Sequence, residues 1–93
     1  ANGGDVTLTA DSQEFTGNIL VDEISSLALT MKNGTSYEGA INPDGDGGTV
    51  DVTLDDDSTW TLTGDSYITS FDGDTSNITA NGYHLYVNGE QVL

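Results

Sequence analysis

The acidic and amide side chains between positions 42 and 51 have the spacing of a calcium-binding loop. Asn42, Asp44 and Asp46 alternate along the chain, and a glycine follows them. In such a loop alternate side-chain oxygens converge on Ca²⁺, and the glycine permits the sharp turn. The position at which a helix-loop-helix site places its last ligand, a bidentate Glu, is Thr53 here, with Asp51 close by. This spacing makes calcium a candidate cofactor, while a solvated acidic turn without metal is the other interpretation. The predicted ligands are Asn42, Asp44, Asp46 and Asp51.

Two other groups of carboxylates could carry chemistry. Asp72 and Asp74 flank a glycine and form a second candidate calcium turn. The run from Asp55 to Asp57 could supply the paired carboxylates of a glycosidase, which stand about 5 to 9 Å apart. Such enzymes also use a long groove and basic residues, and the chain offers only Lys32. We therefore predict that the protein is not an enzyme.

Aromatic side chains are the candidates for ligand binding. Tyr86 and His84 are expected to point outward near the end of the chain, where they could bind a carbohydrate. Phe15, Tyr37 and Trp60 occupy matching positions in successive repeats. They could form a sugar-stacking platform, but a stack inside or over the core is the favoured interpretation, because stacked rings stabilise each other beyond the area that they bury.

These side chains belong to an internal repeat. Two apolar residues around a Thr or similar residue are followed by a polar turn and an aromatic, and the copies begin at Val6, Leu29 and Val52, a period of 23 residues. Leu85 to Val87 is taken as a fourth copy, displaced by an insertion around positions 64 to 74. A fixed period is typical of a solenoid, in which each unit buries its apolar side by stacking on its neighbours.

The repeat is built from strands. Apolar residues alternate with polar ones, as in Val50, Val52 and Leu54, and Asp, Asn and Gly fill the gaps. The predicted fold class is therefore all-β, a short right-handed parallel β-helix of about four coils forming a single domain over residues 1–93. A β-sandwich is the alternative fold, but it would not require the repeat.

A solenoid fold predicts where particular residues lie. Val6, Leu29 and Val52 should lie in one row, and Thr7, Thr30 and Thr53 should form an outward ladder. The Pro- and Gly-rich stretch 42–48 should be a loop, and Asn88-Gly89 should turn the chain so that residues 91–93 form a terminal strand. Exposed edge strands promote association, so each end should be covered by further chain, by another copy or by charge.

Charge limits the partners. Sixteen acidic residues against one Lys and no Arg give a net charge of −15. This balance excludes nucleic acid and anionic membrane surfaces as partners and favours cations. No stretch is long and apolar enough for membrane insertion, and the absence of Cys excludes a disulfide framework.

The second half of the chain resembles a known family. The run from Val52 to Phe71, then Asn77-Ile78 and the closing stretch Tyr83 to Gly89, are similar to the C-terminal end of the β-helix in pertactin-like autotransporter passengers. The resemblance rests on a Trp-containing strand, a Thr-Gly-Asp-Ser turn and a closing Leu-x-Val. It implies an extracellular, surface-displayed adhesin.

We therefore expect a non-enzymatic segment of a cell-surface β-helix that belongs to a longer protein or an assembly. Its partners would be a glycan or a host or cell-surface protein. A carbohydrate-binding module is one alternative function. A self-assembling extracellular fibre subunit, which would associate through uncapped β-edges, is the other.

Overall fold

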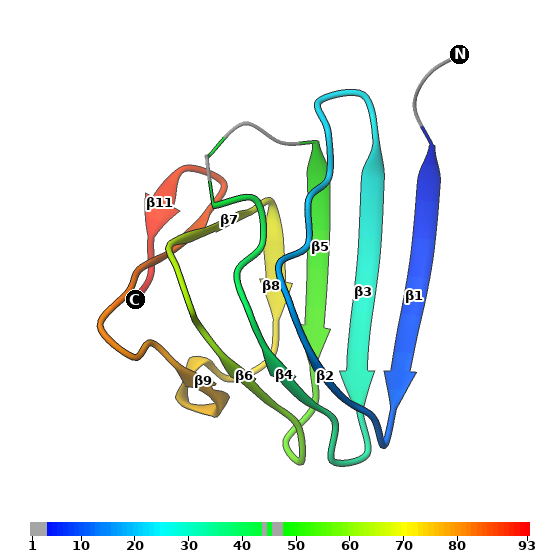
Figure 1. Ribbon diagram of the computed structural model, residues 1–93, viewed down its shortest axis with the longest axis vertical. Helices are drawn as coiled ribbons and strands as arrows, with labels where there is room; N and C mark the ends of the chain where they lie inside the picture. The colour runs from blue at the N-terminus through cyan, green and yellow to red at the C-terminus, as the bar shows by residue number, and fades with distance from the viewer. Residues whose placement is uncertain (1–3, 44, 46–47) are drawn as a thin grey trace.

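The chain winds through about four coils of a β-solenoid (Figure 1). The computed structural model describes residues 4–43, 45 and 48–93. Coil one covers residues 5–25, coil two 26–48, coil three 49–69 and coil four 70–93. Each coil runs along one sheet, turns a corner, runs along a second sheet and returns along a third side. The predicted all-β solenoid is confirmed.

The three sides are hydrogen-bonded sheets. The first has the order β1-β3-β5-β8, with all neighbours parallel. Its strands are β1 (Asp5–Asp11), β3 (Ser26–Lys32), β5 (Thr49–Leu54) and β8 (Ser70–Asp72). The second is also parallel and consists of β2 (Glu14–Thr16), β4 (Ser36–Glu38), β6 (Thr59–Thr61) and β9 (Ile78–Thr79). The third consists of β7 (Ser66–Ile68), β10 (Leu85–Val87) and β11 (Glu90–Gln91). A 3-10 helix, η1 (Thr75–Asn77), lies between β8 and β9.

Alternation of apolar and polar residues places the core inside the coils. In β5, Val50, Val52 and Leu54 are buried while Thr49 and Asp51 are exposed. Because strands stack in register, each inward side chain lies against a similar one in the next coil. One continuous core results, from Ala10 in coil one to Leu85 in coil four.

Asn-Gly pairs set two of the sharp corners. Asn33 and Gly34, between β3 and β4, have φ angles of 58° and 83°. Asn88 and Gly89 have 51° and 80°, and they turn β10 back into the antiparallel strand β11. Both residues of such a turn need positive φ, which Asn and Gly adopt most readily. The predicted Asn88-Gly89 turn and terminal strand are confirmed, although the strand covers Glu90–Gln91.

The predicted row through Val6, Leu29 and Val52 is wrong by two residues in coil one. Leu8 pairs with Leu29, which pairs with Val52, while Val6 lies beside Leu27. Successive coils of the first sheet are offset by 21, 23 and 19 residues, because the corners differ in length. The outward Thr ladder shifts with the row and consists of Thr9, Thr30 and Thr53.

The predicted fourth copy is also misplaced. Leu85–Val87 does not extend the first sheet but pairs with Ser66–Ile68 on the third side. The strand that stacks on β5 is β8, within the segment that the sequence pattern treated as an insertion. That segment is therefore the third side of coil three and the start of coil four.

The aromatic column is confirmed. The ring centroids of Phe15 and Tyr37 lie 4.7 Å apart, and those of Tyr37 and Trp60 lie 5.9 Å apart. Trp60 is fully buried, and its indole nitrogen donates a 3.0 Å hydrogen bond to the carbonyl of Gly39. A buried ring has no face open to solvent, so this column is a packing element and Trp60 cannot be a sugar platform.

Candidate functional site

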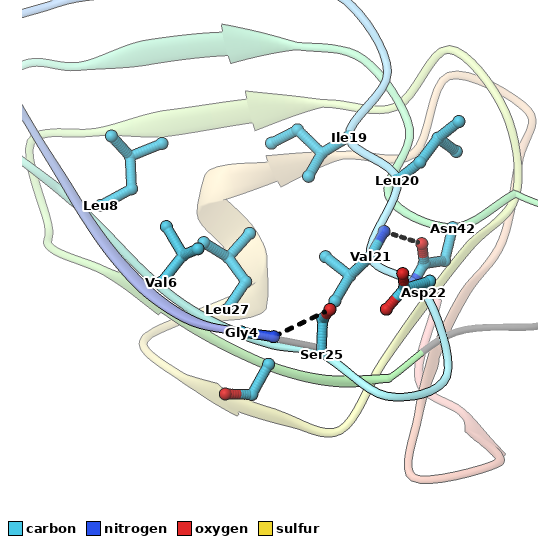
Figure 2. A pocket seen from close by; sticks show the side chains of 11 residues that line it. Gly4, Val6, Leu8, Ile19, Leu20, Val21, Asp22, Ser25, Leu27 and Asn42 are labelled. Carbon is cyan, nitrogen blue, oxygen red and sulfur yellow. Dashed lines mark hydrogen bonds between the residues drawn. The ribbon is translucent and has the colours of Figure 1, made fainter. Parts of the chain in front are cut away.

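An apolar groove lies at the open end of coil one. It has a volume of about 570 Å³. Figure 2 shows Val6, Leu8 and Leu27 from the first sheet pointing toward Ile19 and Val21 from the third side. The remaining lining residues are Gly4, Leu20, Asp22, Ser25, Ser26 and Asn42. We call this surface the coil-one groove.

The coil-one groove is open because coil one is covered on one side only. Val6 is 56% exposed and Leu8 is 44% exposed, while their partners in coil two, Leu27 and Leu29, are 7% and 0% exposed. Leu20 and Ile24 on the third side are more exposed still, at 73% and 61%. Val6 and Leu8, whose partners in coil two are buried, thus meet solvent in coil one.

The backbone edges at this end are also unpaired. In the described sheets β1 and β2 are terminal strands, and their outer N–H and C=O groups face away from their neighbours. Figure 1 shows β1 alone at the edge of its sheet. An edge of this kind is a template for another strand.

The other end is covered on its third side, although β8 and β9 are terminal strands of the first and second sheets. The hairpin places β11 along the outer edge of β10, and Leu93 packs against the core from the end of the chain. Asp74 caps the 3-10 helix, and its side chain accepts a 2.9 Å hydrogen bond from the Ser76 N–H. The two ends of the solenoid are therefore chemically different.

Asn42 is a buried residue in the lining of the coil-one groove. It is 4% exposed, has a φ of 47°, and its side-chain oxygen accepts a 2.7 Å hydrogen bond from the Val21 N–H. Its side-chain nitrogen is buried and has no hydrogen-bond partner within the described chain. The oxygen that the calcium prediction assigns to a metal thus holds the third side of coil one in place.

The other predicted calcium ligands are dispersed or outside the described residues. Asp44 and Asp46 lie outside them. Asp51 points outward from β5, and its carboxylate accepts a 2.7 Å hydrogen bond from the Ser70 hydroxyl. Asp72 is exposed in β8, and Asp74 caps the 3-10 helix, where the Ser76 N–H and hydroxyl hold the pKa of its carboxyl below the ordinary value. In the ranges that the structure describes, no three acidic or His side chains are grouped for a metal ion.

The predicted carbohydrate residues lie on the outer face of the third sheet. Tyr86 stacks on Tyr67, with centroids 4.6 Å apart and planes 6° apart, and the His84 ring meets Tyr86 edge-on at 6.4 Å. The His84 Nδ1 is 3.2 Å from both the Leu93 carbonyl oxygen and the Gln91 side-chain nitrogen. Tyr67 was missed in the sequence because its pairing with Tyr86 depends on the 19-residue offset of the third sheet.

No family model, curated protein or solved structure matches this chain. Over the described residues, no helix has the length and apolar character needed to cross a membrane.

Proposed function

We propose that the chain is a non-enzymatic segment of an extracellular, cell-surface β-solenoid of the adhesin type, which acts as a rigid support and presents ligands on its outer faces. The observation that carries the proposal is the division of each strand into two rows. Inward rows such as Leu8, Leu29 and Val52 are apolar, while outward rows such as Thr9, Thr30 and Thr53 carry hydroxyl groups.

This division suits a support that is exposed to water on all sides. The outward residues of the first sheet also include carboxylates tied to their neighbours, such as Asp5 to the Ser26 hydroxyl and Asp51 to the Ser70 hydroxyl. A single Lys in the chain leaves trypsin-like proteases one cleavage site. An acidic surface rich in hydroxyl groups keeps a repetitive β-structure soluble and discourages edge pairing.

Surface labelling tests this proposal. An antibody raised against the folded chain should label intact cells of the source organism, and added protease should remove the signal without lysis. An antibody against a cytoplasmic protein is the control and should label lysed cells only. A signal that appears only after lysis would refute the proposed location and, with it, the adhesin role.

A carbohydrate-binding module is a second candidate, favoured by the Tyr67, Tyr86 and His84 group on the third sheet. Aromatic rings with nearby polar groups are suited to sugars. The two tyrosines cover one face of each other, so a glycan would contact the ring edges and the His84 side of Tyr86.

A glycan panel tests the second candidate. Binding should be abolished by Tyr86→Ala and kept by Tyr83→Ala, which removes an exposed tyrosine three residues earlier. Tyrosine-ring chemical shifts are the appropriate readout, because buried Trp60 does not report on the outer surface. Binding that survives Tyr86→Ala, or no binding at all, would exclude a glycan site here.

A further inference from the structure

We propose that the coil-one groove is the docking surface for a preceding parallel coil of the same polypeptide. The inference rests on the proposed function, and it identifies the end of this segment at which the solenoid continues. The evidence lies in the groove, in the path by which the chain enters β1, and in the charges along β1.

The groove repeats the interface between coils that already exists in the structure. Leu8 lies over Leu29 in the same way that Leu29 lies over Val52, and Phe15 lies over Tyr37 as Tyr37 lies over Trp60. Val6 and Leu8 are thus covered on the side that faces coil two and exposed on the opposite side. A parallel coil with apolar inward residues would cover Val6 and Leu8 with the geometry found between coils two and three.

The chain enters β1 at the corner from which a preceding coil would arrive. The Gly4 carbonyl accepts a 2.9 Å hydrogen bond from Ser26, as the Ser25 carbonyl accepts one of 3.2 Å from Thr49. Gly4 therefore lies above Ser25, which is the last residue before β3 (Figure 2). Gly4 thus occupies the same position before β1 that Ser25 occupies before β3.

A second copy of the chain fits this surface less well. If two β1 strands paired antiparallel about Leu8, Asp5 of one copy would lie opposite Asp11 of the other, twice in each dimer. Like charges directly opposite one another destabilise a strand pair, and each copy already carries −15. At the opposite end, the β10–β11 hairpin occupies the outer edge of β10. The strands β8 and β9 are terminal in the other two sheets, but they have only three and two residues, so they offer β1, with its seven residues, little to pair with.

The charges also define the chemistry of the preceding coil. The carboxylates of Asp5 and Asp11 accept hydrogen bonds from coil two, Asp5 from the Ser26 hydroxyl and Asp11 from the Asn33 side-chain amide. Outward residues above these two positions should therefore be hydroxyl, amide or basic side chains, not carboxylates. Inward residues should be aliphatic above Val6 and Leu8 and aromatic or branched above Phe15.

The dimensions agree with a segment of a taller stack. Coils rise by about 4.8 Å each, so four coils rise roughly 15 to 20 Å. The longest extent of the molecule is 37 Å and follows the strands of the first sheet (Figure 1). The segment is wider than it is tall, so an open end makes up a large share of its surface.

An extended chain tests the inference. An additional copy of residues 5–25 that carries Asp5→Ser and Asp11→Asn is placed directly before Asp5 of the original coil, so that no carboxylate lies above Asp5 or Asp11. Leu8→Cys is introduced in the original coil. The chain has no other Cys, so thiol labelling reports on this position alone. We expect labelling to slow by at least about tenfold in the extended chain because the thiol becomes buried. We also expect Tm to rise by about 5 °C or more.

Two controls separate the outcomes. Thr9→Cys, one residue along and facing outward, should label equally fast with and without the added coil. An added coil of the same composition in shuffled order should give neither protection nor a higher Tm. Unchanged labelling of Leu8→Cys in the correctly extended chain, or an added coil that protease removes while residues 5–93 stay folded, would overturn the inference.

Sedimentation tests whether a second copy of the chain, and not a preceding coil, occupies the coil-one groove. The unextended chain should be monomeric at micromolar concentration. A dimer that Leu8→Asp dissociates would assign the groove to self-association instead. These experiments use purified protein, so they can fail while surface labelling of cells succeeds, and the reverse is equally possible.

Discussion

The phenolic hydroxyl of Tyr37 donates a 2.7 Å hydrogen bond to the carbonyl of Gly17, in the coil above it. The Ala40 carbonyl lies 3.3 Å from the same oxygen, and the ring is fully buried. One side chain thus fills the aromatic column and also ties the second sheet of coil two to the third side of coil one.

Tyr37→Phe should lower the free energy of unfolding by about 0.5 to 1.5 kcal/mol, since it keeps the ring but removes the hydrogen bond to the Gly17 carbonyl. Urea unfolding at pH 7 measures the loss. Tyr83→Phe removes the hydroxyl of an exposed tyrosine and is the matched control, for which we expect no change. Equal effects of the two substitutions would show that the Gly17 hydrogen bond contributes nothing.

The same hydroxyl should give an alkaline dependence of stability. Burial raises the pKa of Tyr37 well above its ordinary value near 10. Above about pH 10 the unfolded chain loses this proton while the folded chain retains it, so the stabilising contribution is present below pH 10 and declines as the pH rises. Thermal melting between pH 8 and 11 should show a steeper decline for the native chain than for Tyr37→Phe. Parallel curves would contradict this assignment.

Gly48→Ala should be strongly destabilising. A Cβ at this position would lie 1.9 Å from the Ser25 carbonyl oxygen and 2.3 Å from that of Asp22, both backbone atoms. We expect the free energy of unfolding to fall by about 1 to 3 kcal/mol or more, because the backbones of the two neighbouring coils must separate to make room for the methyl group. Gly64→Ala is the control, since its Cβ would meet only the Ala40 Cβ at 3.4 Å. Chemical denaturation of both variants checks the prediction, and equal stability would refute the close approach of the coils.

Asp55→Asn should lower stability at neutral pH but not in acid. The Asn33 N–H, 2.8 Å from one carboxylate oxygen, together with the Ser58 hydroxyl, holds the pKa of Asp55 below its ordinary value. A depressed pKa stabilises the fold above about pH 4, and this contribution is lost as the pH falls through the folded pKa. The difference in Tm between native and variant chains should therefore shrink from pH 7 to pH 3. A Tm difference that stays constant from pH 7 to pH 3 would refute the role of these hydrogen bonds.

Asn42→Ala should lower the free energy of unfolding by about 1 to 3 kcal/mol, because it removes the acceptor of the Val21 N–H. The left-handed φ of 47° adds backbone strain when the residue is Ala. Asn42→Gly removes this strain but not the loss of the acceptor, so comparing the two variants separates the two contributions. Melting with calcium and with a chelator should give the same loss for Asn42→Ala. A calcium-dependent rise in Tm that disappears in this variant would instead make Asn42 a ligand.

The strand class, the solenoid and the aromatic column could be predicted because each depends only on local alternation and a repeated spacing. The register could not, for a physical reason. A shift of two residues keeps every side chain on its own face, so Val6 and Leu8 are equally acceptable above Leu29 by pattern alone. The structure pairs Leu8 with Leu29, because coil one has 21 residues where the pattern assumed 23. Leu85 to Val87 was misplaced because all three sides of the coil use the same alternation.

The candidate site was less predictable. An exposed end was expected, but the sequence did not indicate which end, since Val6 and Leu8 have the same residue types as buried positions. Their exposure of 56% and 44% follows from the missing neighbour above them. The closure of the other end depends on Leu93, whose packing against the core requires the antiparallel β11.

The decrease of burial toward coil one gives the molecule a direction of fraying. Amides of β5, held between two strands, should exchange with solvent only on cooperative opening, whereas the outer amides of β1 should exchange by local opening. During synthesis, coil one leaves the ribosome before coil two, so β1 gains its neighbour β3 only after residues 26–32 have emerged.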